Sequence, residues 1–191
     1  MGSNYYYLVA QLPSLIYGQS IPMSSEAFIA LGQEQMSPKD AAVLDYCTLD
    51  PAPPIEDDTE ATYAMPPPKT PSTLVNNWKV WERTLRLNLA KGRALELKRQ
   101  APAEVPDDPF DAAAVAKTAL YMESPLEAEQ YLDKARWDVI ENLQGTSIFS
   151  EETIYAYLLK LRLMERKAMF NAEEGYTEYK GLYAAILGEK K

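Results

Sequence analysis

The sequence of 191 residues contains no histidine and a single cysteine, Cys47. Without histidine, the chain lacks the Ser-His-Asp and Cys-His arrangements of nucleophilic catalysis, the commonest general base and the commonest zinc ligand. One cysteine excludes an internal disulfide and any metal site built from several cysteines. These absences favour a protein of a reducing compartment that does not use the common hydrolase chemistries.

Long hydrophobic runs and an excess of positive charge are also missing. No apolar run approaches the ~20 residues that a membrane-spanning helix needs. The N-terminus lacks a basic region followed by an apolar stretch, so we expect no signal peptide and a cytoplasmic location. Lys+Arg is 19 against Asp+Glu 28, a net charge of −9. Such a chain is a poor candidate for binding nucleic acid, which rewards clustered positive charge.

The common motifs of catalytic and cofactor-binding sites are absent. The sequence contains no Gly-x-x-x-x-Gly-Lys-Ser/Thr, no Gly-x-Gly-x-x-Gly and no Gly-x-Ser-x-Gly. The segment 57–60 contains three carboxylates but lacks the glycine and the terminal glutamate of an EF-hand loop. Cys47 has acidic flanks, which do not activate a thiol, so we interpret it as a small core residue. We therefore predict no catalytic residues, no cofactor and no metal, and a protein that is not an enzyme.

The signals for secondary structure are those of helices. Ser37 and Ser124 each begin a capping box in which a proline follows at the first helical position. Gly145 stands where a helix is expected to stop, and Glu151 and Glu152 suit the start of the next helix. Apolar residues recur at helical spacing over 128–143, 154–168 and 176–186. Further helices are expected at 25–35, 38–49, 72–99 and 109–123.

The predicted fold is therefore all-α, a helical bundle or paired helical hairpins with a long proline-rich loop. Two stretches leave an alternative open. Residues 5–9 have strand-like composition and could open a helix or lie extended. Residues 84–89 alternate polar and apolar side chains, as a strand would, although the length of the segment favours a helix.

A proline-rich segment divides the chain. Seven of the 21 residues at positions 51–71 are proline, and an acidic run lies among them. No regular element tolerates that density, so we expect a mobile or loosely draped loop. The predicted organisation is an N-terminal helical segment at 1–50, a proline-rich acidic loop at 51–71 and a main helical bundle at 72–191, which together form one compact domain.

Charge is uneven along the chain. Residues 1–70 carry nine acids and two bases, residues 71–100 two acids and seven bases, and residues 101–191 seventeen acids and ten bases. On a helix, Lys79, Arg83, Arg86 and Arg93 fall within about 80° of one another. The first interpretation is that the arginines pair with the protein's own acidic helices, since exposed charge stripes usually have no special partner. The functional interpretation is that this basic stripe binds an acidic partner surface, and these four residues are then the expected contact surface.

Residues 4–15, with the sequence NYYYLVAQLPSL, resemble the opening of a little-characterised bacterial family encoded among the components of V/A-type ATPases. The tyrosine-rich start also resembles the first helix of the C subunit of these ATPases, an all-helical, non-catalytic socket between the central shaft and the membrane ring. The resemblance implies a non-catalytic component or accessory protein of a bacterial V/A-type ATPase that links or assembles the soluble motor and the membrane ring. It implies the protein subunits of the ATPase as partners and peripheral membrane association through the complex. The alternative is a free-standing helical adaptor or scaffold protein.

Overall fold

The computed structural model describes residues 4–50, 69–99, 111–146 and 148–169. Over these ranges the chain is all-α, as predicted, with seven α-helices packed together and no strand. The helices are α1 (Tyr6–Gln11), α2 (Ser25–Gln35), α3 (Pro38–Ala41), α5 (Thr73–Glu96), α6 (Ala112–Leu120), α7 (Pro125–Gln144) and α8 (Glu151–Met169), with the 3₁₀ helix η1 (Leu44–Tyr46) after α3. Most of the predicted loop at 51–71, and the apolar stripe at 176–186, lie outside the described residues.

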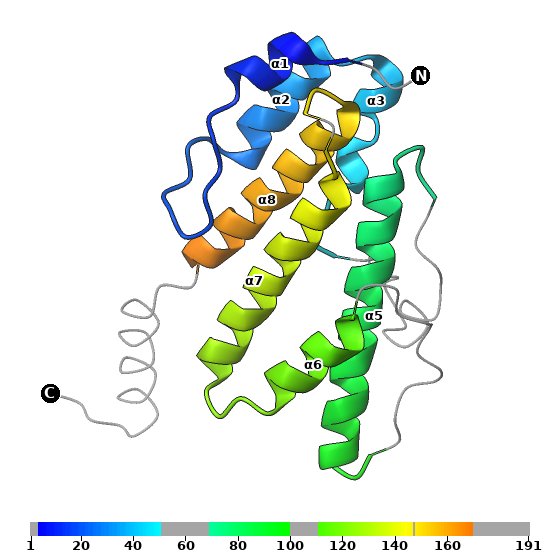
Figure 1. The fold of residues 1–191 in the computed structure, drawn as a ribbon, viewed down its shortest axis with the longest axis vertical. Helices are drawn as coiled ribbons and strands as arrows, with labels where there is room; N and C mark the ends of the chain where they lie inside the picture. Colours follow the sequence, from blue (N-terminus) through cyan, green and yellow to red (C-terminus); the bar gives the residue numbers. More distant parts are fainter. Residues whose placement is uncertain (1–3, 51–68, 100–110, 147, 170–191) are drawn as a thin grey trace, which may run out of the picture.

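Helix α8 is the central helix of the described structure. It contacts α2, α5 and α7, and Figure 1 shows it between α2 and α7. Helix α6 packs against the lower half of α5, and α1 lies at the upper end of the described structure (Figure 1). No described helix is both long and apolar enough to cross a membrane.

One hydrophobic core joins the N-terminal segment to the later helices. Trp78 and Trp81 of α5 are fully buried and stacked, with ring centroids 5.7 Å apart. The Trp78 indole Nε1 donates to the Thr48 carbonyl at 3.0 Å, which ties the end of the N-terminal segment to α5. Phe28 of α2 stacks on Tyr157 of α8 at 4.9 Å. The core thus depends on contacts between segments far apart in the sequence.

Serine side chains mark four of the helix starts. The hydroxyls of Ser24, Ser37, Ser72 and Ser124 each accept a hydrogen bond from the backbone N–H three residues later. The predicted starts at Ser37 and Ser124, each with proline at the beginning of the helix, are confirmed. The reciprocal bond of a capping box does not form at Ser37, whose N–H donates to the Tyr5 hydroxyl at 3.2 Å. Glu152 in the first turn of α8 also accepts from the Ser72 hydroxyl at 2.5 Å and from the Thr73 backbone N–H at 2.9 Å. One carboxylate therefore supports the start of a second helix, where backbone N–H groups have no partner within the helix.

The single helix predicted at 38–49 is wrong, because the chain forms α3 and then η1. The Asp40 carbonyl accepts from the Val43 N–H at 3.1 Å, a tighter turn than an α-helix makes. It also accepts from the Tyr155 hydroxyl of α8 at 3.0 Å. A tertiary hydrogen bond therefore accompanies the break. The two stretches for which a strand or an extended conformation was an alternative are helical. Residues 84–89 lie within α5, and α1 begins at Tyr6.

The C-terminus of α5 ends in a Schellman motif. The Arg99 N–H donates to the Ala94 carbonyl at 2.8 Å, and the Lys98 N–H donates to the Leu95 carbonyl at 3.1 Å. Lys98 occupies the left-handed position of the motif, with φ of 53°. Glycine is the usual residue there, because a side chain with a Cβ is disfavoured in this conformation.

Replacing Lys98 by glycine should raise the free energy of unfolding by about 0.5–1 kcal/mol, because it relieves the left-handed conformation. Urea denaturation followed by tryptophan fluorescence measures the change. Lys98→Ala is the matched control, since it removes the same charge and keeps the Cβ. An equal gain in the alanine variant would show that charge, and not backbone conformation, is responsible.

Candidate functional site

The predicted basic stripe is divided by the structure. Lys79 is only 5% exposed, so it does not belong to an exposed stripe. Its ammonium donates to the Thr48 hydroxyl and to the Asp50 carbonyl, both from the end of the N-terminal segment. Burial is the main cause that lowers the pKa of Lys79 to about 8. The prediction that Lys79 faces a partner is therefore corrected, since it holds the chain's own backbone.

Arg86 pairs with the protein's own acids. Its guanidinium contacts the Asp50 carboxylate at 3.0 Å and the Glu82 carboxylate at 2.8 Å. For this residue the structure favours the alternative of internal ion pairs. Arg83 is half-buried and Arg93 is exposed. The partner-binding role of these two arginines stays a prediction.

The largest charged cluster of the described residues is buried and was not predicted. Glu82 is 0% exposed and Arg136 3% exposed, and the two form a bidentate pair between α5 and α7, with N···O distances of 3.0 and 3.1 Å. Asp133, 4% exposed, accepts from Arg136 at 3.0 Å. Arg166 of α8 lies 3.9 Å from Asp133. We call Glu82, Arg136 and Asp133 the buried ion network.

Electrostatics within the buried ion network follow from burial and pairing. Burial raises the pKa of Asp133, and the nearby Arg166 and Arg136 oppose that rise. Burial alone would lower the pKa of Arg136, but the charge and the hydrogen bonds of Glu82 raise it above its ordinary value. Arg136 therefore stays charged at neutral pH. The network can fix the relative position of α5 and α7, because a buried charge tolerates only its paired arrangement.

An exposed aromatic patch is formed by Tyr6 and Tyr7 of α1 with Phe149 of the loop before α8. Tyr6 is 55% exposed and Tyr7 80%, and Ile148, the residue before Phe149, is 64% exposed. The Tyr6 and Phe149 rings lie 4.9 Å apart. The patch was not predicted, since nothing in the sequence shows that residue 149 returns to the N-terminus.

Three contacts hold α1 so that this aromatic patch faces outward. Leu8 is 2% exposed and packs in the core. The Tyr5 N–H donates to the Phe149 carbonyl at 2.8 Å, and the Tyr5 hydroxyl donates to the Asp40 carboxylate at 2.5 Å. Because successive residues of a helix are 100° apart, burying Leu8 leaves the two preceding tyrosines toward solvent.

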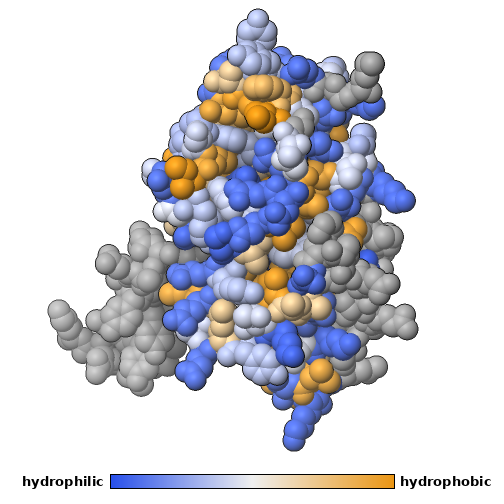
Figure 2. All heavy atoms as spheres, in the orientation of Figure 1, coloured by the Kyte–Doolittle hydropathy of each residue, from blue (hydrophilic) through white to orange (hydrophobic). Residues whose placement is uncertain are grey.

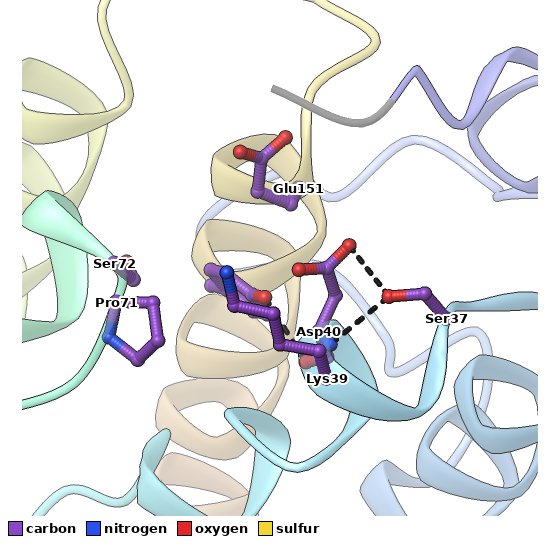
Figure 3. Close-up of a pocket in the computed structure, with 7 residues that line it drawn as sticks. Ser37, Lys39, Asp40, Pro71, Ser72 and Glu151 are labelled. Carbon is purple, nitrogen blue, oxygen red and sulfur yellow. Dashed lines mark hydrogen bonds between the residues drawn. The ribbon is translucent and has the colours of Figure 1, made fainter. Parts of the chain in front are cut away.

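A polar pocket of about 200 Å³ lies where α3, the start of α5 and the first turn of α8 meet. Its lining residues are Ser37, Lys39, Asp40, Pro71, Ser72, Glu151 and Tyr155. Figure 3 shows Glu151 on the first turn of α8, above Lys39 and Asp40 of α3, with Pro71 and Ser72 at the left and Ser37 at the right.

The acids of this pocket differ in their bonding. The Asp40 carboxylate already accepts from the hydroxyls of Tyr5 and Ser37, at 2.5 and 2.9 Å (Figure 3 shows the second bond). The Glu151 Oε2 atom is buried and has no hydrogen-bond partner among the described residues. The pocket therefore offers one open acceptor, which suits a water molecule, while Asp40 serves the start of α3.

Cys47 is fully buried, and its thiol lies 3.5 Å from the Val43 carbonyl. Burial raises the pKa of the Cys47 thiol, so the thiolate does not form at neutral pH. The interpretation as a core residue is confirmed. No group of three or more potential metal-ligating side chains lies within the part of the chain that the structure describes.

Comparison with known proteins identified no relative of this chain. No family model matches the sequence, and neither a curated protein nor a solved structure matches the chain.

Proposed function

We propose that this chain is a non-catalytic accessory component of a bacterial V/A-type ATPase, with the protein subunits of the ATPase as its partners. In this role it is similar to the C subunit, works at the cytoplasmic side and reaches the membrane through the complex. The residues whose sequence suggested the relationship, 4–15, include all of α1 (Tyr6–Gln11). The observation that carries the proposal is that this helix presents the aromatic patch.

The aromatic patch has the properties of a protein-binding surface. Tyrosine is enriched among the residues that contribute most to binding, because it buries a large area and has few rotatable bonds. Contiguous exposed apolar groups on a soluble domain commonly mark interaction sites. The bonds of Tyr5 and the burial of Leu8 hold the patch in place before a partner arrives. Little conformational entropy is then lost on binding.

Co-purification tests the proposal. The tagged wild-type chain should recover ATPase subunits from its native cells, and Tyr6→Ala with Tyr7→Ala should lower that recovery at least about tenfold, the effect of losing one central aromatic contact. Tyr121→Ala is the matched control, because Tyr121 is 78% exposed at the C-terminus of α6. Its recovery should equal that of the wild type.

Two outcomes would contradict the proposal. If the wild-type chain recovers other proteins but no ATPase subunits, the result favours the free-standing adaptor. Equal losses in the double variant and in the Tyr121 control would show that the aromatic patch is not a specific contact.

A further inference from the structure

The C-terminal end of α5 carries two exposed leucines. Leu95 and Leu97 are each 63% exposed. Figure 1 shows this end of α5 projecting beyond the other described helices at the lower end of the molecule. In the same orientation, Figure 2 shows hydrophobic groups among hydrophilic ones there. The Schellman motif fixes the backbone of the last turn, so the leucines are held on a rigid, convex tip.

Basic residues flank the two leucines in the sequence. Between positions 91 and 99 the chain carries four bases, Lys91, Arg93, Lys98 and Arg99, and one acid, Glu96, so this segment has a net charge of +3. All four bases are exposed. Among the described residues, none of them takes part in an ion pair, whereas Arg86 further up the helix is bound by Asp50 and Glu82. Since the whole chain has a net charge of −9, the remainder carries −12.

We propose that the end of α5 is a membrane-binding tip that inserts Leu95 and Leu97 into the interface of an anionic bilayer. We call residues 91–99 the α5 tip. Bases beside an inserted apolar group are attracted to the negative surface potential of acidic lipids, and each base strengthens binding several-fold. The leucines add apolar burial at the boundary between headgroups and acyl chains. The acidic remainder of the molecule is repelled by the same surface, which orients the tip toward the membrane.

The shape of the α5 tip favours a bilayer over an acidic protein surface. A stable protein interface buries about 1,200 Å² or more in total, over two matching patches. A projecting helix end with two leucines offers little of that area. A bilayer admits a convex protrusion without a preformed partner surface. This inference goes beyond the proposed ATPase association and does not depend on it.

Vesicle co-sedimentation of the full chain tests the inference. Wild-type protein should bind vesicles of phosphatidylcholine with roughly 30% phosphatidylserine at least about tenfold more strongly than vesicles of phosphatidylcholine alone at low salt, and the difference should shrink near 0.5 M salt. Lys98→Glu with Arg99→Glu should lower binding to the anionic vesicles at least about tenfold. Leu95→Ser with Leu97→Ser should also weaken binding, and the salt dependence should persist.

The matched control is Lys39→Glu with Lys134→Glu, which makes the same charge change at exposed positions outside the tip. It should bind anionic vesicles like the wild type. Equal weakening in the control would overturn the inference, because net charge alone would then explain binding. Wild-type retention on a polyglutamate column without vesicle binding would overturn it in favour of an acidic protein partner. Circular dichroism checks that each variant keeps its helices, and the leucine variant serves as the test if the charge variant unfolds.

Discussion

Replacing Glu82 by alanine should lower the free energy of unfolding by about 3–5 kcal/mol, because the change leaves Arg136 buried without its main partner. Arg136 is 3% exposed, and two of its three hydrogen bonds to carboxylates go to Glu82. Only Asp133 would remain to balance it. Urea denaturation followed by the fluorescence of the three tryptophans measures the change.

A double replacement distinguishes the effect of losing the ion pair from the cost of leaving one buried charge unpaired. Glu82→Leu with Arg136→Met removes both partners and fills the space with apolar groups of similar size, so it should recover most of the stability lost by Glu82→Ala. Arg86 keeps the Asp50 carboxylate and the Leu49 carbonyl in this variant. Asp133 keeps Arg166 at 3.9 Å. A loss below about 1 kcal/mol in Glu82→Ala would contradict the buried ion network, since a surface pair has that magnitude.

Much of the helical framework could be predicted from the sequence because its signals are local. Ser37 and Ser124 cap the helices that begin after them, and Gly145 ends α7 with φ of 64°. These residues act within one turn of themselves, so their effect does not depend on the rest of the fold. The all-α class followed from the same signals and from apolar periodicity.

The break after α3 and the aromatic patch were harder to predict, because tertiary contacts decide them. The Tyr155 hydroxyl bonds the Asp40 carbonyl across 115 positions of the sequence, at the point where α3 gives way to η1. The Tyr5 N–H bonds the Phe149 carbonyl and so creates the aromatic patch. No periodicity or capping motif contains either contact.

Charged residues on α5 show the same limit. The helical positions of Lys79 and Arg86 indicated a shared basic face, which holds for an isolated helix. The structure covers the upper part of that face with the end of the N-terminal segment, through Thr48 and Asp50. The sequence contains one indication that Glu82 is buried, because this acid follows Trp81 on a mainly apolar helix face. Its partner Arg136 lies on another helix, so the sequence does not indicate the pair.

Replacing Lys79 by methionine should change how the free energy of unfolding depends on pH, and this is the second large effect that we expect. The pKa of Lys79 is lowered from an ordinary value of 10.5 to about 8, mainly by burial. Below pH 8 the folded and the unfolded chain both hold the proton, and the folded state bears the full cost of a buried charge, about 3 kcal/mol. Between pH 8 and 10.5 the unfolded chain binds more protons than the folded chain. The stability contribution of Lys79 therefore rises with pH over this window and is lost as pH falls through it.

Comparison with the methionine variant isolates this effect from other titrations. The raised pKa of Cys47 and the pKa of about 12 at Tyr157 both lower stability at high pH, because the unfolded thiol and phenol lose their protons first. These losses are common to both proteins and cancel in the difference. We expect the wild type to gain about 2–3 kcal/mol relative to Lys79→Met between pH 7 and pH 10, measured by urea denaturation at each pH. A constant difference across that range would mean that Lys79 titrates as an exposed lysine does, and that its contacts with Thr48 and Asp50 do not bury its charge.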